Sequence, residues 1–402
     1  MNKIAALQGS VKHYDWGGFH FIPALLQLKN PELKPFAEYW LGVHPQANTQ
    51  VLPSTEEPVL LSQVINDNPG ATIGDTVNKD FGTVPFLLKL LDVKDMLSIQ
   101  VHPSKAAAAV AFDKENEEGI ALTAPHRNYK DRNHKPELMV AMSDFWLLHG
   151  FKPENELKAV LEKTAELGFL LPYFETGGYA GLYQYVMSLP QADVNKALKP
   201  LADRILPLCE QDKLQKNEED FWAARAMNTF KSDAGIDRGI FSVYLFNVVQ
   251  MKRGEAIFQD AGVPHAYLEG QNVEIMASSD NVLRGGLTTK HIDVPELLKH
   301  TLCQATHPNI LKGELVAGET VFKTPAADFE LGYFSLQAGQ EAGYTAQTTD
   351  ILLLTSGNVI IADGTDTVNL HAGQLAAVVF ANTTVTIQAT EQTELFRATV
   401  PV

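Results

Sequence analysis

Apolar and polar positions follow different patterns in successive parts of the chain, and the first part has the pattern of β-structure. Up to residue 150, short apolar runs are interrupted by Gly, Pro and Asn, as at residues 85–91 (Pro-Phe-Leu-Leu-Lys-Leu-Leu) and 145–148 (Phe-Trp-Leu-Leu). Runs of this length between turn-forming residues are typical of buried strands. We therefore predict an all-β core for this part.

After Pro153 the apolar residues recur at helical spacing. Leu157, Val160 and Leu161 form one such group, and residues 194–205 and 217–230 form two more. Three acidic residues at 218–220 suit the first turn of a helix, where the helix dipole favours negative charge. The pattern predicts a helical domain or insertion over residues 152–232.

Strand character returns at residues 239–249 (Gly-Ile-Phe-Ser-Val-Tyr-Leu-Phe-Asn-Val-Val), and a short connecting helix is predicted at residues 295–298. The last part has apolar runs at 351–355, 358–362 and 376–380 with glycines between them, which predicts a second barrel or sandwich. The expected fold is mainly β with a helical domain. Its expected divisions are a catalytic domain (1–151 and 233–310), the helical domain (152–232) and a C-terminal β domain (311–402).

Length and charge limit the classes of function. The 402 residues can form two or three domains, and 48 acidic against 32 basic side chains argue against nucleic acid or an anionic membrane as a partner. Cys209 and Cys303 are too few for a disulfide framework, and no run approaches the roughly 20 apolar residues of a membrane span. We expect a cytoplasmic, monomeric protein without a membrane or nucleic-acid partner.

The segment 98–103 (Ser-Ile-Gln-Val-His-Pro) carries the strongest chemical signal. Gln100 and His102 stand two positions apart in a strand-like run, so both side chains would point to one side. Glu137 and His265, the latter directly after a proline, could complete a site for one divalent ion. The alternative is that each histidine is a hydrogen-bonded core residue, which is the commoner role of a lone buried histidine.

Other polar residues could join this site, and each also has a structural explanation. Lys89 interrupts an apolar run, so it either meets an anion or is an edge-strand lysine that reaches solvent. Arg284 precedes two glycines that would let backbone approach a ligand, but such an arginine is usually a surface residue. Tyr267, Glu274 and Asp280 could face the site or water. Dinucleotide, Walker and serine-hydrolase motifs are absent from the sequence.

Five segments together resemble the type I mannose-6-phosphate isomerases, a zinc-dependent family. They are residues 9–17 (Gly-Ser-Val-Lys-His-Tyr-Asp-Trp-Gly), 37–45 (Ala-Glu-Tyr-Trp-Leu-Gly-Val-His-Pro), 85–105, 134–137 (His-Lys-Pro-Glu) and 262–284. The resemblance implies a cupin-type β-barrel for the catalytic domain and a second cupin-like barrel at the C-terminal end. It also implies the reversible conversion of mannose 6-phosphate into fructose 6-phosphate.

The resemblance assigns roles to individual residues. It implies that Gln100, His102, Glu137 and His265 bind one Zn²⁺ ion. Lys89 would anchor the sugar phosphate, helped by Ser98 and Lys105, and Tyr267 would contact the substrate. Proton transfer and sugar handling would involve Lys135, His134, Asp280 and Arg284, and Glu274 is a further candidate base that the resemblance does not assign.

The identity of the general base stays open among Lys135, Glu274 and His134, since each could be tuned near neutrality. Two rival functions also stay open. A metal-dependent cupin oxygenase would use a similar ligand set with Fe(II), and a non-catalytic sugar-phosphate-binding cupin would need no base. The donor set would also accept Mn, Co, Ni or Fe in place of zinc.

Overall fold

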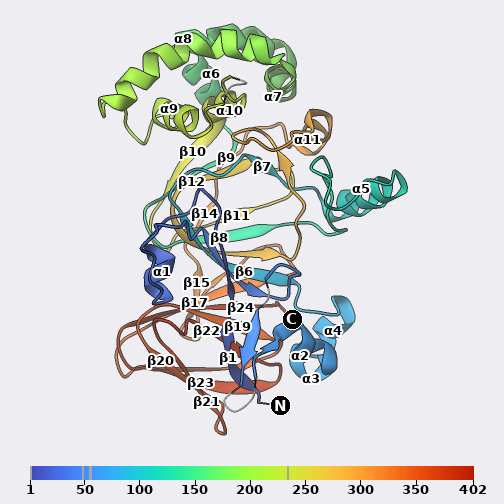
Figure 1. Cartoon of the computed structure of the whole chain (residues 1–402), viewed down its shortest axis with the longest axis vertical. Coiled ribbons are helices and arrows are strands. Elements are labelled where there is room, and N and C mark those ends of the chain that lie inside the picture. Colours follow the sequence, from blue (N-terminus) through green and yellow to red (C-terminus); the bar gives the residue numbers. More distant parts are fainter. Residues whose placement is uncertain (1, 48, 54–56, 233–234) are drawn as a thin grey trace.

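The computed structural model describes residues 2–47, 49–53, 57–232 and 235–402. Figure 1 shows three parts stacked along the long axis, with helices of residues 154–245 at one end, a large sheet in the middle and the C-terminal strands at the other end. No described helix has both the length and the apolar character needed to cross a lipid bilayer.

The middle part is an eleven-stranded sheet whose strands come from both sides of the helical segment. Its strands are β2 (Ser10–Lys12), β3 (Glu38–Gly42), β6 (Phe86–Val93), β7 (Gln100–Val101), β8 (Glu137–Ala141), β9 (Phe145–Phe151), β10 (Phe246–Met251), β11 (Ala256–Gln259), β12 (His265–Ala277), β13 (Leu283–Arg284) and β14 (Ile310–Leu311). The long strand β12 pairs with β6, β7, β8 and β9. It therefore joins the early and late segments of this sheet.

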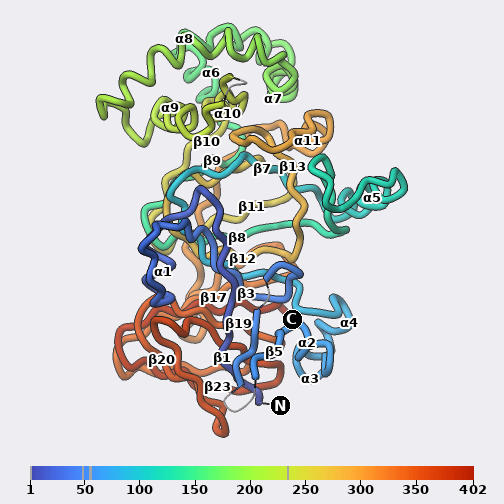
Figure 2. The backbone as a smooth tube through the Cα atoms, in the orientation of Figure 1, coloured from blue at the N-terminus to red at the C-terminus, as the bar shows by residue number. Residues whose placement is uncertain are grey.

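The C-terminal part contains a nine-stranded and a four-stranded sheet. The larger has β1 (Ile4–Gln8), β4 (Gln50–Leu52), β5 (Val59–Leu60), β15 (Glu314–Val316), β16 (Glu319–Phe322), β17 (Glu330–Leu336), β19 (Asp350–Ser356), β22 (Ala376–Val379) and β24 (Thr393–Thr399). The smaller has β18 (Glu341–Ala346), β20 (Val359–Ala362), β21 (Thr367–Leu370) and β23 (Thr383–Ala389). Strand β1 lies between β22 and β4, and Figure 2 shows this N-terminal trace among the C-terminal strands.

Helices gather at one end of the molecule. This group contains α6 (Glu154–Lys163), a 3₁₀ helix (Ala165–Leu170), α7 (Leu171–Ser188), α8 (Gln191–Glu210), α9 (Glu219–Thr229) and α10 (Gly239–Leu245), and buried residues such as Trp222 and Tyr183 fill its core. Helix α11 (Val294–His300) packs against α7 at the same end. Elsewhere are α1 (Phe21–Leu25), α2 (Leu61–Asp67), α3 (Pro69–Ile73), α4 (Asp75–Asp80) and α5 (Lys105–Glu117).

Most predicted elements are confirmed, but two predictions are wrong. Residues 239–245 form α10 and not a strand; all seven side chains are buried, so the apolar run has no periodicity that separates helix from strand. The first 150 residues are not all-β, because α1 to α5 lie there. Helix α5 has a run of alanines, the residues with the best helix propensity, and the Ser104 hydroxyl caps its first turn. The fold is therefore mixed rather than mainly β.

Candidate metal centre and cavity

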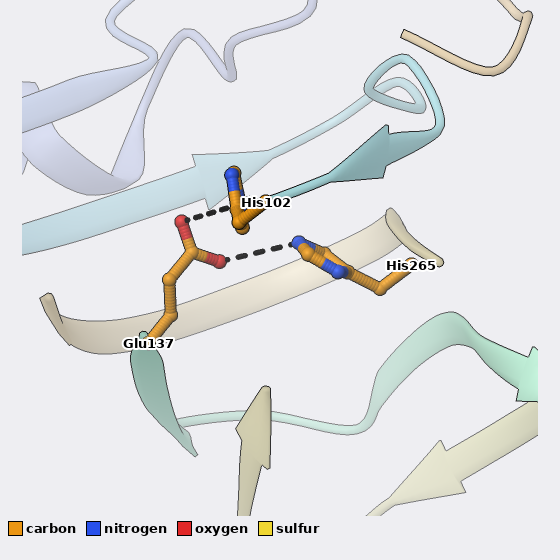
Figure 3. Close-up of side chains that lie close together, drawn as sticks. All are labelled: His102, Glu137 and His265. Atoms are coloured by element: carbon orange, nitrogen blue, oxygen red, sulfur yellow. Dashed lines mark ion pairs between the residues drawn. The ribbon is translucent and has the colours of Figure 1, made fainter. Parts of the chain in front are cut away.

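Three of the predicted ligands converge in the middle sheet. His102 Nε2 lies 3.4 Å from Glu137 Oε1, and His265 Nε2 lies 3.3 Å from Glu137 Oε2 (Figure 3). One possible ligand atom from each residue lies within 4.8 Å of the other two, and all three residues are buried. Glu137 begins β8, His265 begins β12 and His102 follows β7, so the ends of three strands meet here.

The hydrogen bonds of the two imidazoles fix which nitrogen faces the centre. His102 Nδ1 lies 2.8 Å from the carbonyl oxygen of Asn281, and His265 Nδ1 lies 2.9 Å from that of Val263. A carbonyl only accepts, so each Nδ1 carries a proton, and in the neutral ring Nε2 presents a lone pair to Glu137. Both Nε2 atoms are buried without a hydrogen-bond partner among the described residues. Two lone pairs facing a carboxylate repel it unless a cation lies between them, so this donor set fits a divalent metal.

The charges at the centre agree with metal binding. Burial and the nearby Lys135 lower the pKa of His102 to about 4, so its imidazole is neutral at pH 7. Burial alone would raise the pKa of Glu137, but Lys135 and His102 hold that pKa well below its usual value. The Lys135 ammonium lies 3.0 Å from Glu137 Oε1. The centre therefore offers a neutral imidazole at His102 and an ionised carboxylate at Glu137.

Sheet register places the fourth predicted ligand beside His265. Gln100 on β7 is opposite His265 on β12, and Arg284 on β13 is opposite Gln100. Residues directly opposite in an antiparallel pair project to the same face, so these three side chains form one row. All three line the same cavity. On the other side of His265 the row continues with the buried His149 of β9.

A cavity of about 770 Å³ opens beside this centre, a volume suited to a small ligand. Nearly all the predicted site residues line it, namely Lys89, Ser98, Gln100, Lys135, Glu137, His265, Tyr267, Glu274, Asp280 and Arg284. The helical region contributes to its wall through Thr229 and Phe230. The cavity therefore combines the candidate metal ligands with cations, carboxylates and a phenol.

Lys89 lies in this cavity between two buried carboxylates. Its Nζ is 2.9 Å from Glu274 Oε1 and 4.0 Å from Glu38 Oε2. Burial would lower the pKa of Lys89, but the two glutamates raise it above its usual value, so the lysine is charged. The edge-strand explanation is wrong, because β6 lies between β12 and β3 and Lys89 is buried. The charge of Lys89 is thus already neutralised by the protein.

Glu274 receives a second hydrogen bond on its other oxygen. The Tyr267 hydroxyl donates to Glu274 Oε2 at 2.7 Å, and Lys89 donates to Oε1. Glu274 is buried and directly opposite Lys89 in the sheet. Its carboxylate is therefore fixed in orientation by two donors, with further lone pairs available to a ligand.

The cavity is also lined by two cations that have no carboxylate partner among the described residues. No carboxylate oxygen of the described residues lies within 4.0 Å of the Arg284 guanidinium or the Lys290 ammonium. Burial lowers the pKa of Arg284, and burial together with Arg284 lowers that of Lys290. Asp280 instead lies 3.4 Å from His44 Nε2. Arg284 and Lys290 are thus available to an anionic ligand.

Three predicted residues are not among the cavity-lining residues: His102, which is fully buried in the metal group, and His134 and Lys105. His134 Nε2 is 2.8 Å from Asp328 Oδ2, in the segment before β17, and is not among the lining residues. Lys105 is the exposed first residue of α5 and lies over the Phe81 ring. These positions do not agree with a proton-transfer role for His134 or a phosphate contact by Lys105.

Sequence reasoning missed several lining residues. Glu38 and Trp40 on β3 face the cavity, and the Trp40 indole N–H donates to Glu38. Both belong to the resembling segment 37–45 but were not singled out. A glutamate within a wholly buried strand was an available signal, since an isolated buried charge is costly. Lys290, in contrast, is an exposed lysine with no sequence signal.

A β-sheet that holds a His-Glu-His group beside a deep polar cavity defines a metal-dependent enzyme. Comparison with known proteins narrows this class. The family model for the phosphomannose isomerase type I catalytic domain matches residues 4–154. The chain belongs to the type I phosphomannose isomerase family, as its similarity to full-length relatives shows.

Mannose-6-phosphate isomerase from Escherichia coli is 33% identical over 389 residues, which cover 95% of this chain and 96% of that protein. The Homo sapiens protein of the same name is 32% identical over 439 residues, with 98% of each chain covered. The crystal structure of mannose 6-phosphate isomerase from Salmonella typhimurium, bound to substrate and zinc, aligns over the whole of both chains with a TM-score of 0.89 and 30% identity.

Proposed function

We propose that this chain catalyses the reversible isomerisation of mannose 6-phosphate and fructose 6-phosphate, with one zinc ion per chain held by Gln100, His102, Glu137 and His265. The observation that carries the proposal is the convergence of two imidazole lone pairs and a carboxylate beside the cavity. The zinc and substrate in the Salmonella typhimurium structure support it.

Glu274 is the best-placed base for the proton transfer. The reaction moves one proton from C2 of the aldose to C1 of the ketose and a second from the C2 hydroxyl oxygen to the C1 oxygen. A zinc ion, when bound, supplies a Lewis acid that polarises the oxygens at C1 and C2. Glu274 takes the C2 proton and returns it to C1, while Lys89 and Tyr267 keep the carboxylate oriented. Lys135 fits this role less well because its Nζ lies 3.0 Å from Glu137 Oε1 and already contacts a candidate metal ligand.

Arg284 and Lys290 are the proposed phosphate contacts. Lys89, which the resemblance suggested, has its charge neutralised by Glu274 and Glu38 and lies within the sheet. Arg284 and Lys290 have no such partner and line the same cavity. A guanidinium suits phosphate oxygens because its donors form a planar fork. Arg284 can also stabilise negative charge that develops on the sugar oxygens, since it lies in the row with Gln100 and His265.

Replacing Lys290 by methionine should raise KM for mannose 6-phosphate about 10-fold and change kcat little, because a charge-assisted hydrogen bond to the phosphate is lost. Steady-state kinetics on the wild-type chain and on Lys290→Met would measure this change. The matched control is Lys290→Arg, which keeps the charge and should stay near the wild-type KM. A fall in kcat at unchanged KM would contradict a phosphate contact.

The domain arrangement belongs to the same proposal. We assign the strands of residues 1–151 and 233–310, other than β1, β4 and β5, to a cupin-type domain, with the helical domain at 152–232 and a cupin-like unit at 311–402 that those three strands join. The hydrogen-bonded path of described middle strands runs from β14 to β2 without closing. Strand β1 pairs with β22, which favours moving the first strands to the C-terminal unit.

The direct test is a coupled assay for fructose 6-phosphate formed from mannose 6-phosphate. The wild-type chain should be active, should lose activity when a chelator removes the metal, and should regain it when zinc is returned. Other divalent ions added in parallel would compare the metals that this donor set accepts. Absence of activity with every metal would refute the isomerase proposal.

A further inference from the structure

We infer that Gln259 is a positioning residue that directs the single proton of the Tyr267 hydroxyl onto Glu274. This inference rests on the proposed function, in which Glu274 is the base. Gln259 ends strand β11, is fully buried and does not line the cavity. It therefore acts on the reaction through Tyr267 and not by contact with substrate.

The direction of each hydrogen bond follows from donor and acceptor chemistry. Lys89 donates to Glu274 Oε1, and the Tyr267 hydroxyl donates to the other oxygen, Oε2, at 2.7 Å, so the phenol proton is used in the bond to Glu274. With that proton committed, the Tyr267 oxygen can only accept from a second partner. The Gln259 side chain lies 3.0 Å from this oxygen. Only its amide N–H₂ group can make that contact, so Gln259 donates.

The pairing of β11 with β8 fixes the position of Gln259 close to the candidate metal centre. Gln259 is directly opposite Glu137 in the pairing of β11 with β8, so the same strand pair carries a candidate metal ligand and this amide. The bond to Tyr267 is the one side-chain hydrogen bond of Gln259 among the described residues, and its Oε1 has no partner there. A buried amide is costly in an apolar core unless it is hydrogen-bonded. Its placement therefore indicates a role that a leucine of similar size could not fill.

Two substitutions of similar size separate orientation from packing. Gln259→Met keeps the volume and removes the donor, so the Tyr267 hydroxyl is held less firmly. Gln259→Glu replaces the donor by an acceptor that competes with Glu274 for the Tyr267 proton. We expect kcat to fall about 5-fold for Gln259→Met, and further for Gln259→Glu, as expected for one misdirected buried hydrogen bond. KM should stay within about 2-fold, because Gln259 does not touch the cavity.

The experiment is a double-mutant cycle with zinc content measured for every variant. Gln259→Met is made in the wild-type chain and in Tyr267→Phe, which lacks the hydroxyl. If Gln259 acts through Tyr267, it lowers kcat in the first background and has no further effect in the second. The control is Ile257→Met, a buried residue on the same face of β11 without a polar group, which should leave kcat unchanged.

Two results would overturn the inference. One is an unchanged kcat in Gln259→Met, and the other is an equal fall in both backgrounds, which would show an effect on packing. If the wild-type chain itself proves inactive, the proposed function fails. The free energy of unfolding of the same four proteins is then measured in place of kcat. Coupling between Gln259 and Tyr267 there would support the hydrogen bond, and its absence would overturn it.

Discussion

Replacing His265 by alanine should remove zinc from the chain and lower kcat about 1000-fold. The two imidazoles and Glu137 are the buried donors that face one another, so loss of one leaves too few ligands for a stable site. The Lewis-acid contribution of a catalytic metal is several kcal/mol, which corresponds to about three orders of magnitude in rate. Zinc per chain, measured by elemental analysis, and kcat from the coupled assay would both report the loss.

His149→Asn is the matched control for this experiment. His149 is also buried and lies directly opposite His265 in the sheet, but it is not part of the three-residue group. The control should retain zinc and most of the activity. A His265→Ala variant that still bound one zinc and turned over at the wild-type rate would contradict the assigned metal centre.

Replacing Lys89 by methionine should destabilise the protein by about 3–5 kcal/mol, because Glu274 and Glu38 would be left as buried carboxylates without a cation. Burial already raises the pKa of Glu38, and Lys89 opposes that rise. Without the lysine the folded-state pKa of Glu38 should rise further. A carboxyl group whose pKa is higher in the folded state than in the unfolded state makes the folded protein less stable as pH increases. The free energy of unfolding of the variant should therefore fall as pH rises above the unfolded-state pKa of a glutamate.

Denaturant titrations at several pH values would measure this effect. Lys105→Met is the comparison, since Lys105 is exposed and pairs with no carboxylate in the described part of the chain. Its unfolding free energy should change by no more than about 0.5 kcal/mol. The assignment of Lys89 as the counter-ion of two glutamates would be wrong if both variants were equally stable at every pH. A selective rise in KM without loss of stability would restore the phosphate-anchoring role.

The sequence was informative where residue type limits the possible environment. A lysine inside an apolar run had to meet an anion or water, and the structure shows the anions. The metal ligands could be proposed because two histidines next to prolines, together with a glutamate, form a combination that is typical of a metal site. The contacts of the other polar residues were harder to predict. Lys89 with Glu274, and His134 with Asp328, are pairs of residues far apart in the chain.

Secondary structure was hardest to predict where burial is complete. Helix α10 and strand β6 are both completely buried and mostly apolar, and only their tertiary surroundings separate them. The position of Gln259 was equally hidden, because a glutamine near the end of a strand has no distinctive sequence signal. Its role follows only from the two contacts of the Tyr267 oxygen.

The insertion of β1 between β22 and β4 has a consequence for biosynthesis. On a ribosome, β1 is made among the first residues, whereas its partner β22 is made near the end of the chain. One edge of β1 must stay unpaired during most of translation, and exposed strand edges favour association with other nascent chains. The C-terminal sheet therefore assembles late, so cellular yield of this protein should depend on chaperone protection of that early edge.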